Sequence, residues 1–196
     1  CALSIMGEGK VHDPAGEIVD SLVAMKAAGI KPVELEEKEG LALINGTDGM
    51  LGMLIMAVTD LEELSKVADI TAAMSIEGLL GTDKVFAPEL HFPLRPQVGQ
   101  AVSAANIFGM LKNSAIVASH INDTSQVQDA YSLRCAPQVA GAVRDTISYA
   151  KTIAQRELES SIDNPVVLPD GRVQSNGNFH GAPVAYVLDF LAIAAT

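Results

Sequence analysis

The chain has 196 residues, enough for one buried core, and 48% of them are apolar while only 4% are aromatic, a composition typical of packed helices. A formal net charge of −11 argues against binding to the phosphate backbone of a nucleic acid. Two cysteines are too few for a disulfide framework or a zinc cluster, so we expect a reducing, cytoplasmic location.

The first predicted element is a short amphipathic helix within residues 13–29. Asp13 and Pro14 match an N-cap followed by proline at the first helical position, and apolar residues then recur at helical spacing. Gly29 and Pro32 supply the stop signals. The next segment, residues 33–40, carries four glutamates and one lysine, a charge pattern that predicts a solvated connection.

Long helices dominate the rest of the predicted structure. Between residues 47 and 80, apolar side chains recur every three or four positions without a proline, which predicts a helix of roughly 30 residues. Gly46, Gly49 and Gly52 at its start allow a close backbone approach or a bend. Three more helices are predicted, from Arg95-Pro96 to about Ser119, from Ala136-Pro137 to about Glu159, and from about Ala182 onward.

One strand signal stands out among these helices. Residues 165–174 contain two short β-prone runs around a Pro-Asp-Gly turn, which predicts a small β-hairpin. The richest apolar window, residues 50–58, is shorter than the roughly 18 residues of a membrane span and is interpreted as a core helix. The sequence therefore predicts a mainly α fold, a bundle of long helices with one small β-hairpin and no domain linker.

The two ends of the chain carry no start or stop signals. It opens on CALSIM without an initiator methionine, and it closes on AYVLDFLAIAAT, an apolar helical pattern that continues to the last residue. We therefore expect residues 1–196 to be a single internal fragment of a longer protein.

Four polar islands interrupt the apolar pattern. Polar groups buried in a helical bundle must find hydrogen bonds, or each costs a few kcal/mol. The islands are therefore either structural networks or sites. Their sequences are LALINGTDG around Asn45, VQDAYSLRC around Tyr131, ESSIDNPVV around Asp163, and QSNGNFHGAPVA around Phe179.

Gln128, Tyr131 and Arg134 are spaced three apart, so one turn of chain can aim all three at one place. Arg134 offers a permanent charge and a fork that matches a carboxylate, Tyr131 a hydroxyl that can move a proton, and Gln128 a neutral donor and acceptor. Because Pro137 disfavours helical geometry at the residue before it, we expect the triplet on the loop into the third long helix. A carboxylate-binding site and a structural network both fit this cluster.

The other islands also allow structural interpretations. Asn45 can belong to an N-cap of the long helix, and Asp163 to a helix stop. Phe179 and His180 lie in a loop before a helix. Phe179 can be an aromatic side chain of the core, and His180 a polar side chain whose hydrogen bonds are satisfied within the fold. The four histidines show no metal-ligand spacing, and neither a P-loop nor a GxGxxG motif is present, so we expect no metal and no nucleotide.

Considered together, the islands resemble a known family. EGLALINGT, QDAYSLRCAPQVAG, SSIDNPVV and SNGNFHGAPVA resemble, in this order and at similar separations, the histidine ammonia-lyase branch of the aromatic amino acid ammonia-lyases. The similarity covers essentially the whole chain, and four separated motifs in register rarely occur together by chance.

The resemblance implies an enzyme that removes ammonia from L-histidine to give trans-urocanate. The family uses an electrophilic 4-methylideneimidazole-5-one (MIO), formed by cyclisation of its own Ala-Ser-Gly segment. The resemblance also implies the all-α bundle shared with fumarase and aspartase, assembled as a homotetramer whose active sites draw on several subunits. On this basis residues 1–196 would be part of the central helical domain.

Each matching residue acquires an implied role. Arg134 would bind the substrate carboxylate, and Tyr131 would join the proton-transfer network around the β-carbon. Gln128 would position groups beside the MIO, and Asn45 would hydrogen-bond near it. Phe179 would pack against the MIO or the substrate ring.

The implied substrate is histidine because QDAYSLRC and NFHG resemble the histidine enzymes. His180 is assigned to substrate binding, since plant-type phenylalanine enzymes favour glutamine at that place. The alternatives are a tyrosine or phenylalanine ammonia-lyase or aminomutase, a non-catalytic helical assembly module, and a two-chain enzyme whose other chain carries the electrophile.

No Ala-Ser-Gly occurs in the 196 residues, and the nearest approach, residues 118–120, has histidine in place of the glycine that cyclisation needs. We expect the electrophile-bearing part before Cys1 and further catalytic residues beyond Thr196. The chain by itself is therefore predicted to be inactive toward L-histidine. The ultraviolet absorbance of urocanate, followed with the purified 196-residue chain, checks this, and a measurable increase would contradict it.

Overall fold

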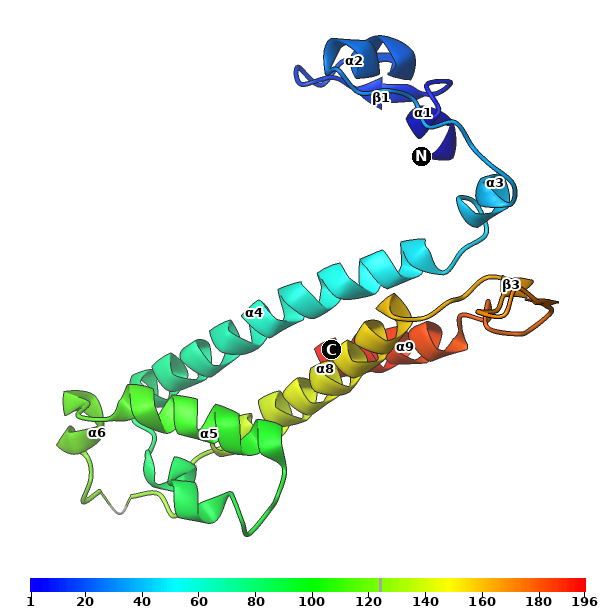
Figure 1. The fold of residues 1–196 in the computed structure, drawn as a ribbon. Helices are drawn as coiled ribbons and strands as arrows, with labels where there is room; N and C mark the ends of the chain where they lie inside the picture. Colours follow the sequence, from blue (N-terminus) through cyan, green and yellow to red (C-terminus); the bar gives the residue numbers. More distant parts are fainter. Residues whose placement is uncertain (124) are drawn as a thin grey trace. The chain divides into compact units, whose positions relative to one another are not determined.

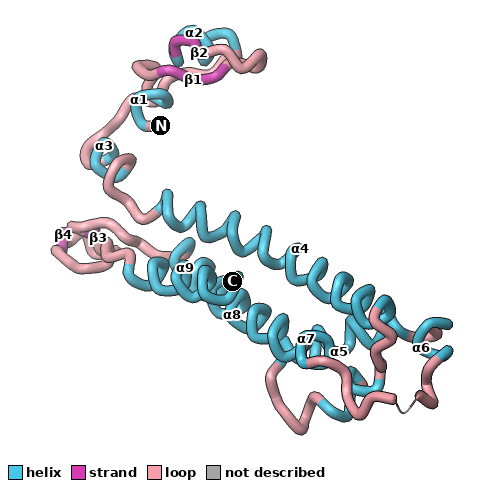
Figure 2. Tube along the Cα trace, turned by 180° about the vertical axis from the view of Figure 1, so that it is seen from behind, coloured by secondary structure: helices cyan, strands magenta, loops and turns pink. Residues whose placement is uncertain are grey.

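The computed structural model describes residues 1–123 and 125–196. These residues form two compact units, which are described separately. The first unit comprises residues 1–48 and 161–180, and the second comprises residues 49–160 and 181–196. Helices make up most of both the ribbon and the tube views, which confirms the mainly α prediction (Figures 1 and 2).

The first unit begins with a hairpin that the sequence analysis missed. After α1 (Ala2–Ile5), strands β1 (Lys10–His12) and β2 (Ile18–Asp20) pair antiparallel. The Asp13 carboxylate accepts hydrogen bonds from the backbone of Ala15 and Glu17, each at 2.9 Å, and Gly16 adopts a φ of +87°. Asp13 therefore closes a β-turn instead of capping a helix.

The predicted helix over residues 13–29 is consequently wrong in its first half. Only its second half is helical, as α2 (Ser21–Ala27), and Gly29 ends it with a φ of +68° as expected. The segment predicted to be a solvated connection leads into a further short helix, α3 (Glu39–Ala42).

The predicted hairpin after residue 165 is confirmed. Strands β3 (Val166–Val167) and β4 (Val173–Gln174) pair antiparallel. Within the turn, Asp170 accepts hydrogen bonds from the backbone and the guanidinium of Arg172, and Gly171 has a φ of +83°. The described part of the chain thus contains two small hairpins where the sequence predicted one.

Three long helices surround the main core of the second unit. The predictions near residues 47–80, 136–159 and 182 onward are confirmed by α4 (Asp48–Gly78), α8 (Ala136–Leu158) and α9 (Ala182–Ala195). Figure 1 shows α8 and α9 side by side. Buried side chains of all three helices form one cluster, which includes Leu54, Val58, Ile147, Ala150, Val184 and Val187.

The helix predicted from residue 95 to residue 119 is interrupted. It consists of α5 (Val98–Leu111) and α6 (Ala115–Ser119). Asn113 takes a left-handed φ of +64°, and the Ser114 hydroxyl accepts a hydrogen bond from Val117 N at 3.1 Å, which caps α6 as a new helix. Before α5 lie two single turns of 3-10 helix, η1 (Lys84–Phe86) and η2 (Pro88–Leu90).

A buried ion pair connects α4, α5 and α8. The Arg144 guanidinium of α8 donates to Asp69 of α4 at 2.6 Å and to Ser103 of α5 at 2.9 Å. It also donates to the backbone oxygen of Ser65 at 2.9 Å, while Asn106 donates to Asp69 at 2.7 Å. The side chains of Arg144 and Asp69 are 18% and 2% exposed, so this network lies largely out of water.

The backbones of α5 and α8 touch where two glycines meet. A Cβ added to Gly141 would overlap the backbone nitrogen of Gln100, and one added to Gly99 would overlap the backbone oxygen of Gly141. At the start of α4, the sequence predicted that Gly46, Gly49 and Gly52 allow a close backbone approach or a bend. A Cβ added to Gly46 would lie 3.0 Å from the backbone oxygen of Ala42, whereas no described atom lies within 4 Å of one at Gly49 or Gly52.

None of the described helices has both the length and the apolar character required to cross a membrane.

We predict that Gly141→Ala lowers the free energy of unfolding by about 1–3 kcal/mol, because the new methyl group meets backbone that cannot rotate away. Gly109→Ala in α5 is the matched control. Gly109 is exposed, no described atom lies within 4 Å of its added Cβ, and alanine there should stabilise by up to about 1 kcal/mol. Chemical denaturation of the two variants checks both signs, and equal stabilities would contradict the close contact.

Candidate functional site

Tyr131 and Arg134 form the two ends of α7 (Tyr131–Arg134), a single helical turn directly before α8. The guanidinium carbon of Arg134 lies 4.5 Å from the centre of the Tyr131 ring, within the range of a cation–π interaction. The structure therefore brings these two predicted site residues into contact. Their position is a short helix, whereas we had expected a loop.

Arg134 carries a hydrogen-bond donor with no assigned acceptor. Its Nε is buried, yet no acceptor for it is found among residues 1–123 and 125–196. A buried donor without an acceptor is costly, and a guanidinium is best satisfied by a carboxylate or phosphate. Arg134 therefore has the free hydrogen-bonding capacity that an anion-binding residue needs.

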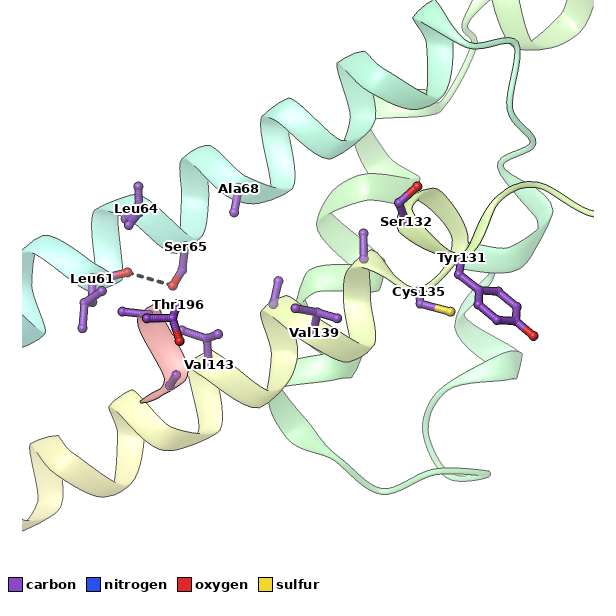
Figure 3. A pocket seen from close by; sticks show the side chains of 14 residues that line it. Leu61, Leu64, Ser65, Ala68, Tyr131, Ser132, Cys135, Val139, Val143 and Thr196 are labelled. Atoms are coloured by element: carbon purple, nitrogen blue, oxygen red, sulfur yellow. Dashed lines mark hydrogen bonds between the residues drawn. The ribbon is translucent and has the colours of Figure 1, made fainter. Parts of the chain in front are cut away.

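A cavity of about 500 Å³ lies beside α7 in the second unit. Figure 3 shows Tyr131 at one end of it, with its ring pointing away from α4. The Tyr131 side chain is 73% exposed. The rest of the lining is mostly apolar and comes mainly from α4, α8 and the end of α9, including Leu61, Leu64, Ala68, Val139, Val143 and Ala194.

Gln128 does not share this cavity. It lies in the loop before α7 and lines a separate cavity of about 390 Å³, together with Asp129 and His120. The Asp129 carboxylate accepts a hydrogen bond from Thr82 N at 2.7 Å, which holds this part of the loop against the end of α4. Gln128 lies before the helical turn, which begins only at Tyr131. The structure therefore brings Tyr131 and Arg134 together, but not Gln128.

In the first unit, Asn45 and Phe179 line one cavity of about 300 Å³. They belong to different polar islands, 134 positions apart in the sequence. The structure thus brings together two motifs whose proximity the sequence pattern did not show. The lining alternates amides and charged groups with apolar side chains, and includes Lys38, Leu41, Ile162, Asp163 and Asn164. His180 follows Phe179 in the chain, and its backbone N donates to Gly177 O at 3.1 Å.

Lys38 is a site residue that sequence reasoning missed. Its ammonium forms an ion pair with Asp163 and donates to the backbone oxygen of Pro165 at 2.7 Å. In the sequence it is the one lysine among four glutamates, and that charge pattern predicted only a solvent-exposed connection. Its partner lies 125 positions away, so local pattern could not reveal the pair.

The same ion pair shifts the titration of Asp163. The hydrogen bond from Lys38, followed by that from the backbone N–H of Asn164, lowers the pKa of Asp163 below its ordinary value. No group of three or more histidine, cysteine or acidic side chains in the described part of the chain is arranged to hold a metal ion.

Comparison with known proteins decides the family. The model of the aromatic amino acid lyase family matches residues 1–196. The chain belongs to this family. It is 65% identical over 195 residues to a histidine ammonia-lyase of Streptomyces avermitilis and 64% identical over 194 residues to one of Streptomyces coelicolor. These alignments cover 100% and 99% of this chain and 38% of each relative, so the chain spans little more than a third of their length.

Solved structures of lyases and aminomutases share the fold. A tyrosine aminomutase from Streptomyces globisporus superposes with a TM-score of 0.87 at 37% identity, covering 98% of this chain and 40% of that one. A histidine ammonia-lyase from Trypanosoma cruzi superposes with a TM-score of 0.82 at 38% identity, covering 98% and 35%.

We predict that Lys38→Met raises the pKa of Asp163 toward its ordinary value of about 3.9, by less than the full shift because Asn164 N still donates. In the parent chain the pKa is lowered on folding. The stability that this carboxylate contributes is therefore present above about pH 4 and is lost as the pH falls through the folded-state pKa.

Carbon-13 NMR titration of the aspartate carboxyl groups measures this change. Asp170 is the internal control, because its pKa is lowered by Arg172 and should not respond. An unchanged Asp163 titration in the variant would exclude the ion pair as the cause.

Proposed function

We propose that the protein to which this chain belongs is a histidine ammonia-lyase, which converts L-histidine into trans-urocanate and ammonia. The observation that carries this proposal is the identity of 64–65% over essentially the whole chain to three curated histidine ammonia-lyases. Among the solved structures, the histidine ammonia-lyase is 38% identical and the aminomutases and phenylalanine ammonia-lyases are 29–37% identical, so the branch rests on the sequence relatives. In the reaction, the bond between the amino nitrogen and the α-carbon breaks, the β-carbon loses a proton, and a double bond forms between the two carbons.

Arg134 is proposed to bind the substrate carboxylate. Its buried Nε, which has no acceptor in the described structure, supports this role because a carboxylate can accept two parallel bonds from a guanidinium. The Tyr131 ring contacts the same guanidinium, so a substrate held by Arg134 would lie near the Tyr131 hydroxyl. Tyr131 is proposed to take part in moving the β-proton.

The family's MIO group would be supplied by an Ala-Ser-Gly segment that these 196 residues do not contain. When present, it provides an electrophile that makes the amino group a leaving group. The cavity shared by Asn45 and Phe179 fits such a small polar ring, since it offers an amide that can donate and accept and an aromatic face. We propose that Asn45 and Phe179 hold the group and that His180 contributes to substrate binding. For Gln128, which lines the separate cavity of the second unit, a role beside the group is proposed from the family resemblance alone.

We further propose a cytoplasmic homotetramer. Large apolar side chains remain exposed along α4 of this chain, and such faces are normally covered by other protein. They include Met53, Met56, Leu64, Val67 and Met74, each at least 50% exposed.

The deciding experiment is performed on the product of the whole surrounding gene. L-histidine, L-tyrosine and L-phenylalanine are offered separately, and intact mass is measured in parallel. Turnover of histidine with a mass deficit of two waters supports the proposal. Turnover of tyrosine or phenylalanine but not of histidine would assign the protein to another branch of the family. If none of the three amino acids is turned over and the mass shows no deficit, the protein would be a non-catalytic helical scaffold.

In that protein we predict that Arg134→Lys lowers kcat/KM for L-histidine about 10- to 100-fold, because lysine keeps the charge but loses the planar fork. Arg172→Lys is the matched control. Arg172 is an exposed arginine that pairs with Asp170 in the turn of the β3–β4 hairpin, and its replacement should leave kcat/KM unchanged. Steady-state kinetics measure both, and equal effects would contradict carboxylate binding by Arg134.

A further inference from the structure

The Lys38–Asp163 ion pair connects the two segments that form the 300 Å³ cavity in the first unit. One segment runs from Lys38 through α3 to Asn45. The other runs from Asp163 through the β3–β4 hairpin to Phe179. The ammonium of Lys38 contacts both the Asp163 carboxylate and the backbone oxygen of Pro165, so it binds the second segment at two points.

On the first segment, backbone hydrogen bonds transmit the position of Lys38 to Asn45. Ala42 N donates to Lys38 O at 3.1 Å, and Asn45 N donates to Leu41 O at 2.9 Å. These bonds belong to consecutive turns of one short helical stretch, so a displacement of the Lys38 backbone is passed on toward Asn45. Lys38 itself has a φ of +72°, a left-handed conformation that non-glycine residues adopt only when surrounding contacts hold them there.

On the second segment, asparagine side chains transmit the position of Asp163 to Phe179. The Asn176 amide donates to Asp163 O at 3.0 Å, and Asn176 N donates to the Asn164 side chain at 2.9 Å. Asn178 N then donates to the Asn176 side chain at 2.7 Å, directly before Phe179. The loop that carries Phe179 is therefore attached to the residue that pairs with Lys38.

We propose that Lys38 and Asp163 are a positioning pair, which sets the Asn45 amide and the Phe179 ring at their working separation across this cavity. The proposal rests on the function proposed above for Asn45 and Phe179. The pair acts through these residues and is not assigned any contact with substrate. Because the two side chains are 44% and 59% exposed, the pair adds little to stability, and its effect is expected in catalysis.

The test uses the whole protein with L-histidine and the variants Lys38→Met, Asp163→Asn, their double variant, and Lys38→Arg. A misplacement of about 1 Å can cost about 100-fold in rate, so the single variants should lower kcat about 10- to 100-fold with little change in KM or Tm. The double variant should be no worse than either single one, because both remove the same contact. Lys38→Arg should recover most of kcat, since it keeps the cation.

Lys10→Met is the matched control. Lys10 forms an exposed ion pair with Asp20 at 2.7 Å in the same unit, between β1 and β2, and its loss should leave kcat unchanged. Three results would overturn the proposal. They are a normal kcat in Lys38→Met, an equal loss of kcat in Lys10→Met and Lys38→Met, and additive losses of kcat in the double variant.

Crystal structures of the parent and of Lys38→Met provide a readout that does not depend on activity. The separation between the Asn45 amide and the Phe179 ring should change in the variant, and an unchanged separation would overturn the positioning role whatever the kinetics. If the parent protein turns over no amino acid, the proposed function fails, while these structures still test the pair.

Discussion

The ion pair between Arg144 and Asp69 is the contact on which the arrangement of the second unit depends. One guanidinium reaches α4, α5 and its own α8, and the Asp69 carboxylate receives bonds from two of these helices. Removing one partner of a buried pair typically costs about 3–5 kcal/mol, because the other charge is left without compensation. Because its bonds are directional and reach three helices, the pair favours the register in which all of them form. Since α7 is joined directly to the start of α8, that register also determines where Tyr131 and Arg134 lie.

The sequence predicted elements well wherever one local signal dominated. The long helices α4, α8 and α9 follow from apolar periodicity, and the starts of α8 and α9 follow also from proline near their first positions. The errors occur where a side chain has two possible uses. Asp13 can cap a helix or close a turn, and its bonds to Ala15 and Glu17 select the turn. Ser114 interrupts a run whose apolar spacing continues on both sides, so periodicity alone could not detect the cap.

The candidate site shows the same limit at longer range. The contact between Tyr131 and Arg134 follows from their spacing, because residues three apart are neighbours on a helix. The shared cavity of Asn45 and Phe179, and the pairing of Lys38 with Asp163, depend on contacts between segments more than a hundred positions apart. No single-sequence pattern encodes such contacts. The resemblance of the motifs to a family implied that the polar islands act together, and the structure joins those around Asn45, Asp163 and Phe179 in one cavity.

The start of α5 is controlled by another helix. Its N-cap residue Gln97 makes no side-chain capping bond in the described structure, and Gly99 N instead donates to the Asp145 carboxylate of α8 at 2.8 Å. Beginning a helix is the unfavourable step of its formation, and a cap is one of the few local ways to reduce that cost. Because this cap comes from α8, α5 gains it only on docking. Its backbone amides should therefore open to hydrogen exchange together with those of α8, as one cooperative folding unit.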